Sequence, residues 1–233
     1  MQQRYNDKET VSLLARVPPF TSLKPAYIAE LASKVRIRNY RRGEIIFHKD
    51  DPGPTLYIIK TGQVKITTYS GEGEEVILSI LTENEFFGEL SLLDGKPRSA
   101  NATAIEPTQV LVLQQRDFLD TIDKHPEIAR EIMAVLSERL RRTNRLLEDV
   151  VFLDLAARLC SRLLELCEKH GHKTDKGIEI DLRFTQQDLA DYIGASRVAV
   201  NKLLGSFREK GMISVFSKHI IVHRPDELRK RIY

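Results

Sequence analysis

Hydrophobic and polar positions divide the chain into three stretches with different periods. Near the N-terminus, Leu13, Leu14 and Val17 precede the pair Pro18-Pro19, which predicts short helical pieces. From Val35 onward, short apolar runs alternate with turn residues, and the predicted strands are 45–47, 56–59, 64–66, 76–78 and 110–113. Several short strands at intervals of about ten residues predict a small antiparallel sandwich or roll.

A single long helix is predicted after His125. Its apolar positions recur at three- and four-residue steps: Ile128, Ile132, Leu136, Leu140, Leu147 and Val150. Such a helix with one apolar stripe has little small domain to pack against, so an identical partner is expected to cover it. Packing within the chain is the alternative. Thr143 lies in the gap of this stripe beside Asn144, and a buried hydroxyl there needs a hydrogen-bond partner.

The segment 184–216 predicts a helix-turn-helix. Thr185 stands three residues before Asp188, as an N-cap does, and Gly194 precedes a second cap at Ser196. A hairpin wing is predicted from 212–216 and 220–222. The expected DNA contacts are Thr185, Gln186, Gln187, Ser196, Arg197, Val198, Asn201, Lys202 and Lys218. A helical hairpin without a nucleic-acid role is the alternative.

Composition is consistent with two domains and excludes several classes. The 233 residues carry 36 Lys and Arg against 33 Asp and Glu, and the basic excess lies after residue 125. No apolar run is long enough to span a membrane and no signal-peptide core is visible, so a soluble, cytoplasmic protein without a membrane partner is expected. Cys160 and Cys167 are predicted to be buried small hydrophobes. The six His residues are scattered, with 170–172 predicted as loop, so neither a metal nor catalysis is expected.

The most informative segment is 87–100, which reads F-G-E-L-S-L-L-D-G-K-P-R-S-A. Gly88 lets backbone approach an anion, and Glu89 offers a carboxylate suited to a sugar hydroxyl. Arg98 and Ser99 supply a bidentate cation and a hydroxyl for a phosphate. An ordinary glycine-containing hairpin with a solvated arginine is the alternative.

This run resembles the phosphate-binding cassette of cyclic-nucleotide-binding domains. With the long helix and the winged helix-turn-helix after it, nearly the whole chain resembles the cyclic-AMP receptor protein/fumarate-nitrate regulator superfamily of bacterial transcription factors. The resemblance implies an α+β fold: a cyclic-nucleotide-binding jelly roll (1–125), a dimerisation helix (126–153) and a winged helix-turn-helix (154–233). It also implies a homodimer that responds to cyclic AMP, binds double-stranded promoter DNA, works with RNA polymerase and is not an enzyme.

The resemblance also implies a set of ligand contacts. Arg98 and Ser99 would hold the cyclic phosphate beside the backbone of the G-E-L motif, and Glu89 would take the ribose 2′-hydroxyl. Thr143 would read the adenine within one subunit and Asn144 from across the dimer, while Arg139 would brace Glu89. The whole set is Gly88, Glu89, Leu90, Ser91, Arg98, Ser99, Arg139, Thr143 and Asn144.

Two positions depart from the cyclic-AMP receptor pattern. The recognition helix begins Ser196-Arg197-Val198, whereas those receptors have an acidic base reader in place of Val198. This helix looks more like that of the cyanobacterial nitrogen regulator, so GTA-type half-sites are the hypothesis. Asn144 replaces the usual serine, which leaves cyclic GMP or a cyclic dinucleotide open.

Other functions also stay open at this point. One is a response to another effector, and another is constitutive DNA binding with a vestigial cassette. A third is a role as the regulatory subunit of an enzyme. The hypothesised switch is a ligand-dependent extension of the long helix through Phe152 and Asp154.

Overall fold

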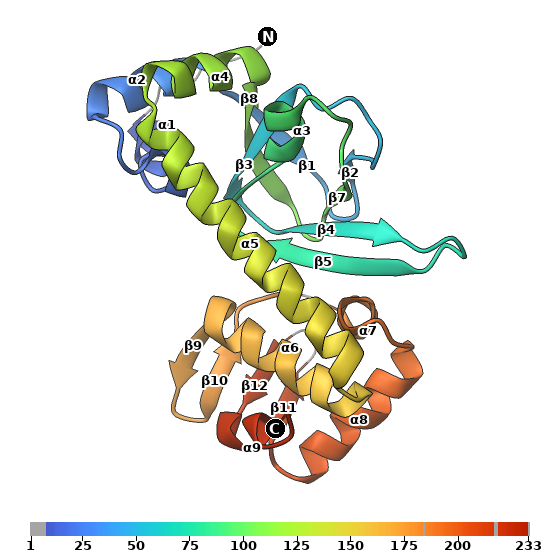
Figure 1. The fold of residues 1–233 in the computed structure, drawn as a ribbon. Helices are drawn as coiled ribbons and strands as arrows, with labels where there is room; N and C mark the ends of the chain where they lie inside the picture. The colour runs from blue at the N-terminus through green and yellow to red at the C-terminus, as the bar shows by residue number, and fades with distance from the viewer. Residues whose placement is uncertain (1–7, 184, 217–218, 233) are drawn as a thin grey trace. The chain divides into compact units, whose positions relative to one another are not determined.

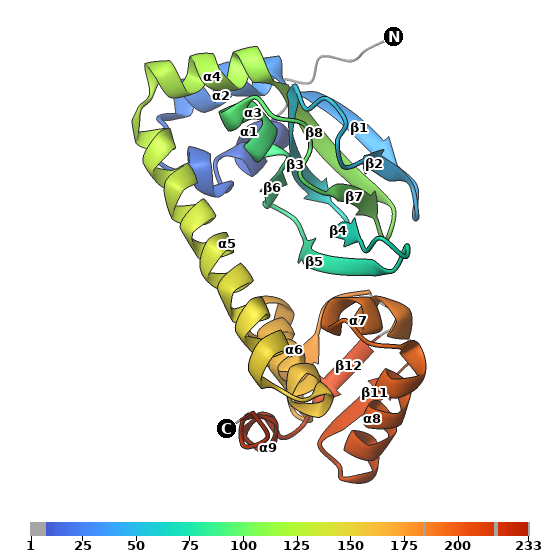
Figure 2. The same cartoon turned by 45° about the vertical axis from the view of Figure 1, so that its right-hand side comes forward.

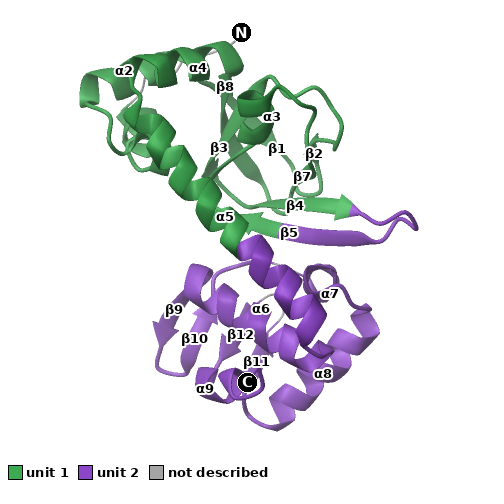
Figure 3. Cartoon of the chain, in the orientation of Figure 1, with its two compact units in different colours: residues 1–68, 79–141 green, residues 69–78, 142–233 purple. Residues whose placement is uncertain are grey.

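The computed structural model describes residues 8–183, 185–216 and 219–232. They form two compact units, the first comprising residues 1–68 and 79–141 and the second residues 69–78 and 142–233 (Figure 3). The boundaries fall at the two ends of segment 69–78 and within one long helix, between residues 141 and 142. Lys218 lies outside the described residues, so its predicted DNA contact stays a prediction.

The first unit is a β-sandwich with helices before and after it (Figure 1). Its two four-stranded sheets have the strand orders β1-β8-β3-β6 and β2-β7-β4-β5. The strands are β1 (Arg36–Tyr40), β2 (Ile45–Phe47), β3 (Thr55–Thr61), β4 (Val64–Tyr69), β5 (Glu75–Leu81), β6 (Phe86–Phe87), β7 (Asn101–Ala104) and β8 (Thr108–Gln114). The helices are α1 (Lys8–Leu14), η1 (Pro18–Phe20), α2 (Pro25–Lys34), α3 (Glu89–Asp94) and α4 (Gln115–Lys124).

The central strand β3 is apolar on both faces because both are covered. Leu56 and Ile58 belong to a cluster with residues of α1, α2 and α4. Tyr57 and Ile59 point the other way, into a cluster with residues of both sheets. Successive side chains of a strand alternate between its faces, so one strand contributes to both cores. Thr55, which contacts the cassette, is the first residue of this strand.

The predicted strands are all present, and the structure adds elements that the pattern did not predict. Strands β1 and β7 have no continuous apolar run, and β6 is only two residues long. Helix α3 occupies the cassette itself, beginning after Gly88 and ending at Gly95, both with left-handed backbone (φ +83° and +70°). Glycine adopts such a conformation without steric cost, which explains both ends of this short helix.

The predicted long helix is α5 (Glu127–Phe152). Met133, Leu140 and Leu147 are 59%, 62% and 64% exposed in the single chain. They stand seven residues apart, which places them on one stripe of the helix. Ile128 and Ile132 of the predicted stripe are instead buried in the core of the first unit, with Leu136 packed against it. The alternative of packing within the chain therefore holds for the start of α5, and only the later part presents an apolar face that the described residues leave uncovered.

The second unit is a winged helix-turn-helix (Figure 2). Its helices are α6 (Leu155–His170), α7 (Gln186–Ile193), α8 (Arg197–Glu209) and α9 (Pro225–Arg229). Its sheet has the order β11-β12-β10-β9, from β9 (Gly171–Thr174), β10 (Gly177–Ile180), β11 (Ile213–Phe216) and β12 (His219–Val222). The prediction of a loop at 170–172 is wrong, because β9 begins at Gly171 and pairs with β10.

Local sequence explains the turn between α7 and α8. Thr185 and Asp188 form a reciprocal capping box, and Gly194 ends α7 with φ +63°. Ser196 then caps α8 by accepting from the amide of Ala199 at 3.2 Å. The predicted caps and turn are thereby confirmed. Cys160 and Cys167 are free and buried, as predicted. None of the helices in the described ranges is long and apolar enough to cross a membrane.

Candidate functional site

Arg98 is the centre of the cassette and is only 3% exposed. Its Nη1 donates to the carbonyl of Gly88 at 2.7 Å, and its Nη2 donates to the carbonyl and hydroxyl of Thr55 at 2.8 and 3.0 Å. The guanidinium also lies over the ring of Phe47, 4.3 Å from the centroid, and 5.6 Å from that of Tyr57. Burial lowers the pKa of Arg98, but an arginine remains charged at neutral pH.

Two glycines make room for this side chain. A Cβ on Gly88 would lie 2.6 Å from Nη1 of Arg98. A Cβ on Gly53 would lie 2.4 Å from the Cβ of Ser91 and 3.0 Å from Nε of Arg98. The role of Gly53 in the cassette is visible only in the folded chain. Any larger residue at either position would displace the guanidinium.

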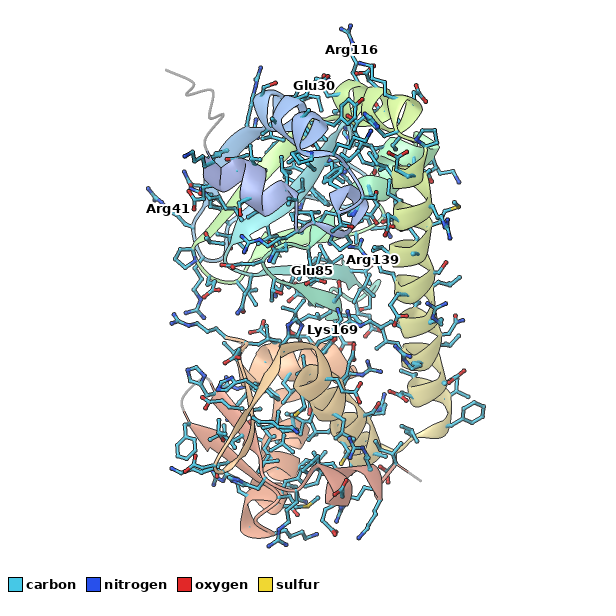
Figure 4. The ribbon with its side chains drawn as sticks, turned by 90° about the vertical axis from the view of Figure 1, so that its left-hand side faces the viewer. Glu30, Arg41, Glu85, Arg116, Arg139 and Lys169 are labelled. Atoms are coloured by element: carbon cyan, nitrogen blue, oxygen red, sulfur yellow. The ribbon has the colours of Figure 1, made fainter. Side chains whose placement is uncertain are left out.

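Glu89 is the second buried charge of the cassette, at 3% exposure. Arg139 reaches it from α5 (Figure 4), with Nη1 donating to Oε1 of Glu89 at 2.8 Å and Nη2 to the carbonyl of Phe86 at 2.5 Å. The expected contact between Arg139 and Glu89 is therefore present. This contact fixes Oε1 of the carboxylate and does not involve Oε2.

Two buried polar atoms of this cassette have no hydrogen-bond partner among the described residues. They are Nε of Arg98, a donor, and Oε2 of Glu89, an acceptor. An unsatisfied buried polar atom costs about 1–3 kcal/mol, and more when it belongs to a charged group. A ligand with an anionic oxygen and a hydroxyl would satisfy both atoms.

The other expected ligand residues are placed less centrally. Ser91 is buried beside Gly53, whereas Leu90 and Ser99 are exposed. Thr143 and Asn144 are exposed on the part of α5 that belongs to the second unit. Sequence reasoning missed Thr55, Phe47 and Tyr57, because nothing in a strand's apolar pattern marks a residue as an arginine's neighbour.

The recognition helix α8 separates its residues as predicted. Val200, Leu204 and Phe207 are buried, and Leu203 is half-buried. The opposite face consists of exposed residues: Arg197, Val198, Asn201 and Lys202. Val198 is 78% exposed, so an apolar side chain stands at a position suited to a base edge.

The residues expected to support DNA binding at the start of α7 are accessible too. Gln186 and Gln187 are exposed, and Nε2 of Gln187 donates to Oδ1 of Asp191 at 2.7 Å. Thr185 is engaged in the capping box, and Ser196 caps α8. No group of three or more His, Cys, Asp or Glu in the described ranges could hold a metal ion.

Comparison with known proteins places both units. The cyclic nucleotide-binding domain family matches residues 37–125, and the Crp-like helix-turn-helix domain family matches residues 157–231. The CRP-like cAMP-activated global transcriptional regulator of Mycobacterium tuberculosis is 34% identical over 219 residues, which are 94% of this chain and 98% of that protein. The chain belongs to the CRP/FNR family of transcription regulators.

Other members of the family are similar to nearly the same extent. The global nitrogen regulator of Nostoc is 36% identical over 197 residues, 84% of this chain and 88% of that protein. The solved structure of CLP, the c-di-GMP responsive global regulator of Xanthomonas campestris, has a TM-score of 0.74 at 23% identity and covers 86% of this chain and 99% of its own. That last likeness shows the fold alone.

Membership in the CRP/FNR family confirms three of the predictions. The α+β fold is a cyclic-nucleotide-binding β-sandwich, a long helix and a winged helix-turn-helix. The chain is a DNA-binding transcription regulator, and regulators of this family are not enzymes. Family membership does not fix the effector, because the relatives that are at least 30% identical include a cAMP-activated regulator and a global nitrogen regulator.

Proposed function

We propose that the chain is a cyclic-AMP-responsive transcription regulator that binds promoter DNA as a homodimer. The observation that carries the effector is the pair of partnerless buried atoms, Nε of Arg98 and Oε2 of Glu89. A cyclic nucleotide carries an anionic phosphate and a ribose 2′-hydroxyl, one group for each atom. The M. tuberculosis relative, named as cAMP-activated, supports the same choice.

Each cassette residue has a role in this proposal. Arg98 and Ser99 bind the cyclic phosphate with the amides near Gly88 and Leu90, and Ser91 packs beneath it. Glu89 accepts from the ribose hydroxyl while Arg139 holds the carboxylate. Thr143 and Asn144 contact the base, the first within a subunit and the second from its partner.

The homodimer rests on the uncovered stripe of α5. Met133, Leu140 and Leu147 repeat every seven residues, and Val150, 59% exposed, continues the stripe. A seven-residue repeat of apolar side chains is the pattern of a two-helix seam. Sedimentation equilibrium of the wild-type chain and of Leu140→Glu tests this point. We expect the wild type to sediment as a dimer and the variant as a monomer.

Isothermal titration calorimetry tests the effector. Cyclic AMP, cyclic GMP, cyclic di-GMP and 2-oxoglutarate are titrated into the wild-type protein and into Gly53→Leu, whose side chain would fill the space beside Arg98. Binding of cyclic AMP by the wild type alone is the expected result. If another of these molecules bound more tightly, it would be the effector instead of cyclic AMP. If none of them bound, the protein would be a constitutive DNA binder.

DNA binding is tested by selection from a random-sequence duplex pool followed by gel shifts with and without cyclic AMP. The exposed Arg197 and Val198 lead us to expect GTA-type half-sites, with guanine read by Arg197. Enrichment of TGTGA-type half-sites would overturn this operator. RNA polymerase is the proposed further partner, tested by transcription in vitro from a promoter carrying the selected site.

A further inference from the structure

Six polar or charged residues meet where three helices of the second unit come together. Three of them are almost fully buried: Arg142 is 9% exposed, Arg162 4% and Tyr192 3%. The six, called here the three-helix network, are Arg142 and Asp149 of α5, Ser161, Arg162 and Glu165 of α6, and Tyr192 of α7. None of them belongs to the ligand or DNA contacts described above.

The charges of this network balance. Arg162 binds Asp149 through Nη2 at 2.5 Å and Glu165 through Nη1. Arg142 forms an ion pair with the same Glu165. The hydroxyl of Ser161 donates to Asp149 at 2.7 Å. Two guanidinium groups thus face two carboxylates across the junction of α5 and α6.

Tyr192 connects the helix-turn-helix to these charges. Its hydroxyl accepts from Nη2 of Arg142 and lies 3.4 Å from Oε1 of Glu165, to which it donates. Its ring lies 5.9 and 5.7 Å from the guanidinium carbons of Arg142 and Arg162. Burial raises the pKa of Tyr192, so the hydroxyl keeps its proton.

The position of Tyr192 along the chain gives this contact a consequence. It lies two residues before Gly194, where the turn leads directly into α8. Its neighbours in α7, Leu189, Ala190 and Ile193, are buried and apolar, and apolar packing is non-directional. A hydrogen bond constrains direction, so the Tyr192 hydroxyl fixes the rotation of α7 against α5 and α6.

We propose that Tyr192 is a positioning residue for DNA binding, which orients the helix-turn-helix relative to the end of α5 through Arg142 and Glu165. The inference rests on the proposed function, because it names how the DNA-binding surface is held. A buried ion network adds little net stability over apolar packing, so orientation is what this network contributes.

Tyr192→Phe tests the proposal, since it removes one hydroxyl and keeps the ring between the two arginines. The probes are cyclic AMP and a duplex enriched by the wild-type protein from a random pool. We expect DNA affinity at saturating cyclic AMP to fall at least about tenfold, because the variant loses the hydrogen bonds of the hydroxyl to Arg142 and Glu165, and one hydrogen bond to a charged group is typically worth that much. Cyclic AMP affinity stays within about twofold of wild type, because the cassette is untouched. Tyr27→Phe, on α2, is the matched control.

Amide hydrogen exchange gives a readout that does not need DNA. In Tyr192→Phe we expect residues 186–193 to exchange about tenfold faster, while strands β3 and β8 keep their wild-type protection. Arg142→Gln should reproduce both effects, with Arg229→Gln, which breaks an exposed pair to Asp226 at 2.7 Å, as its control.

The outcomes separate the two proposals. Unchanged DNA affinity together with unchanged exchange in α7 would overturn the role of Tyr192, even if the melting temperature fell. If the wild type bound no cyclic AMP, the effector proposal would fail and the DNA comparison would be made without nucleotide. If the wild type enriched no duplex, the proposal of DNA binding would fail. The role of Tyr192 in orienting α7 would then be tested by hydrogen exchange in α7 alone.

Discussion

Buried arginines occur in two regions of the chain, and the groups that they contact differ in charge. Arg142 and Arg162, in the second unit, contact carboxylates of Glu165 and Asp149. Arg98, in the first unit, is equally buried but donates to neutral groups of Gly88 and Thr55. The first arrangement pairs both guanidinium groups with carboxylates, whereas no carboxylate of the described residues is hydrogen-bonded to Arg98.

This difference separates a structural site from a binding site. A buried ion that is paired keeps its charge at little net cost, while one that meets only dipoles pays a desolvation penalty that an incoming anion relieves. Burial accordingly lowers the pKa of Arg98. The carbonyls of Thr55 and Gly88 hold the guanidinium in place but do not neutralise it.

Removing an arginine from the paired region should have the largest effect on folding. Arg162→Met leaves the half-buried carboxylates of Asp149 and Glu165 without this partner, so we expect the free energy of unfolding to fall by about 3 kcal/mol. Urea unfolding followed by circular dichroism measures it. Arg229→Met, at an exposed pair, should change it by less than about 1 kcal/mol. Equal losses in the two variants would contradict the description of the network as structural.

The matching change in the ligand region should affect binding more than folding. Arg98→Leu removes the phosphate's cation, and losing two charge-assisted hydrogen bonds of about 1.5–3 kcal/mol each weakens cyclic AMP binding at least about a hundredfold. Calorimetry measures the affinity, with the exposed Arg41→Leu as control. The unfolding free energy should fall less than in Arg162→Met, because no carboxylate loses a hydrogen-bond partner. Wild-type affinity in Arg98→Leu would refute the site.

The sequence predicted the cassette better than its surroundings. Glycine, glutamate and arginine at this spacing predict a phosphate- and sugar-binding site. Apolar periods of two and of three to four residues predict strands and helices. Thr55 and Tyr192 could not be found in this way, because each sits in an ordinary apolar run and acquires its partner only through tertiary packing. Strand β9 was missed because its four residues, G-H-K-T, contain no apolar side chain, and β10, G-I-E-I, alternates over too few residues to give a clear period.

A smaller change tests whether the neutral partners of Arg98 compete with the ligand. Thr55→Val removes the hydroxyl that accepts from Nη2 at 3.0 Å and keeps the backbone carbonyl. The donor is a charged guanidinium, and a hydrogen bond to a charged group is worth about 1.5–3 kcal/mol, so cyclic AMP affinity should rise at least about tenfold. Thr55→Ser, which retains the hydroxyl, should bind as the wild type does. A fall in Thr55→Val would mean that Thr55 holds Arg98 in its ligand-binding position.

The smallest effect at neutral pH concerns Cys160 and Cys167, which are buried in the second unit. Burial raises the pKa of each thiol from 9.0 to about 11. Between these values the unfolded chain has lost protons that the folded chain still binds, so stability should fall as the pH rises from about 9 to about 11. Below pH 9 the thiols should contribute no slope.

Urea unfolding at pH 8 and pH 10 measures this loss, and Cys160→Ala with Cys167→Ala is the reference that should lose less stability between them. A thiol-reactive dye should label neither cysteine in the folded protein at pH 8 and both in urea. Rapid labelling without urea would contradict the burial. Ionisable groups thus respond to burial in three ways here: the thiols remain neutral, Arg162 is paired, and Arg98 is held charged by dipoles. Of these groups, only Arg98 is a buried charge that an anionic ligand could neutralise.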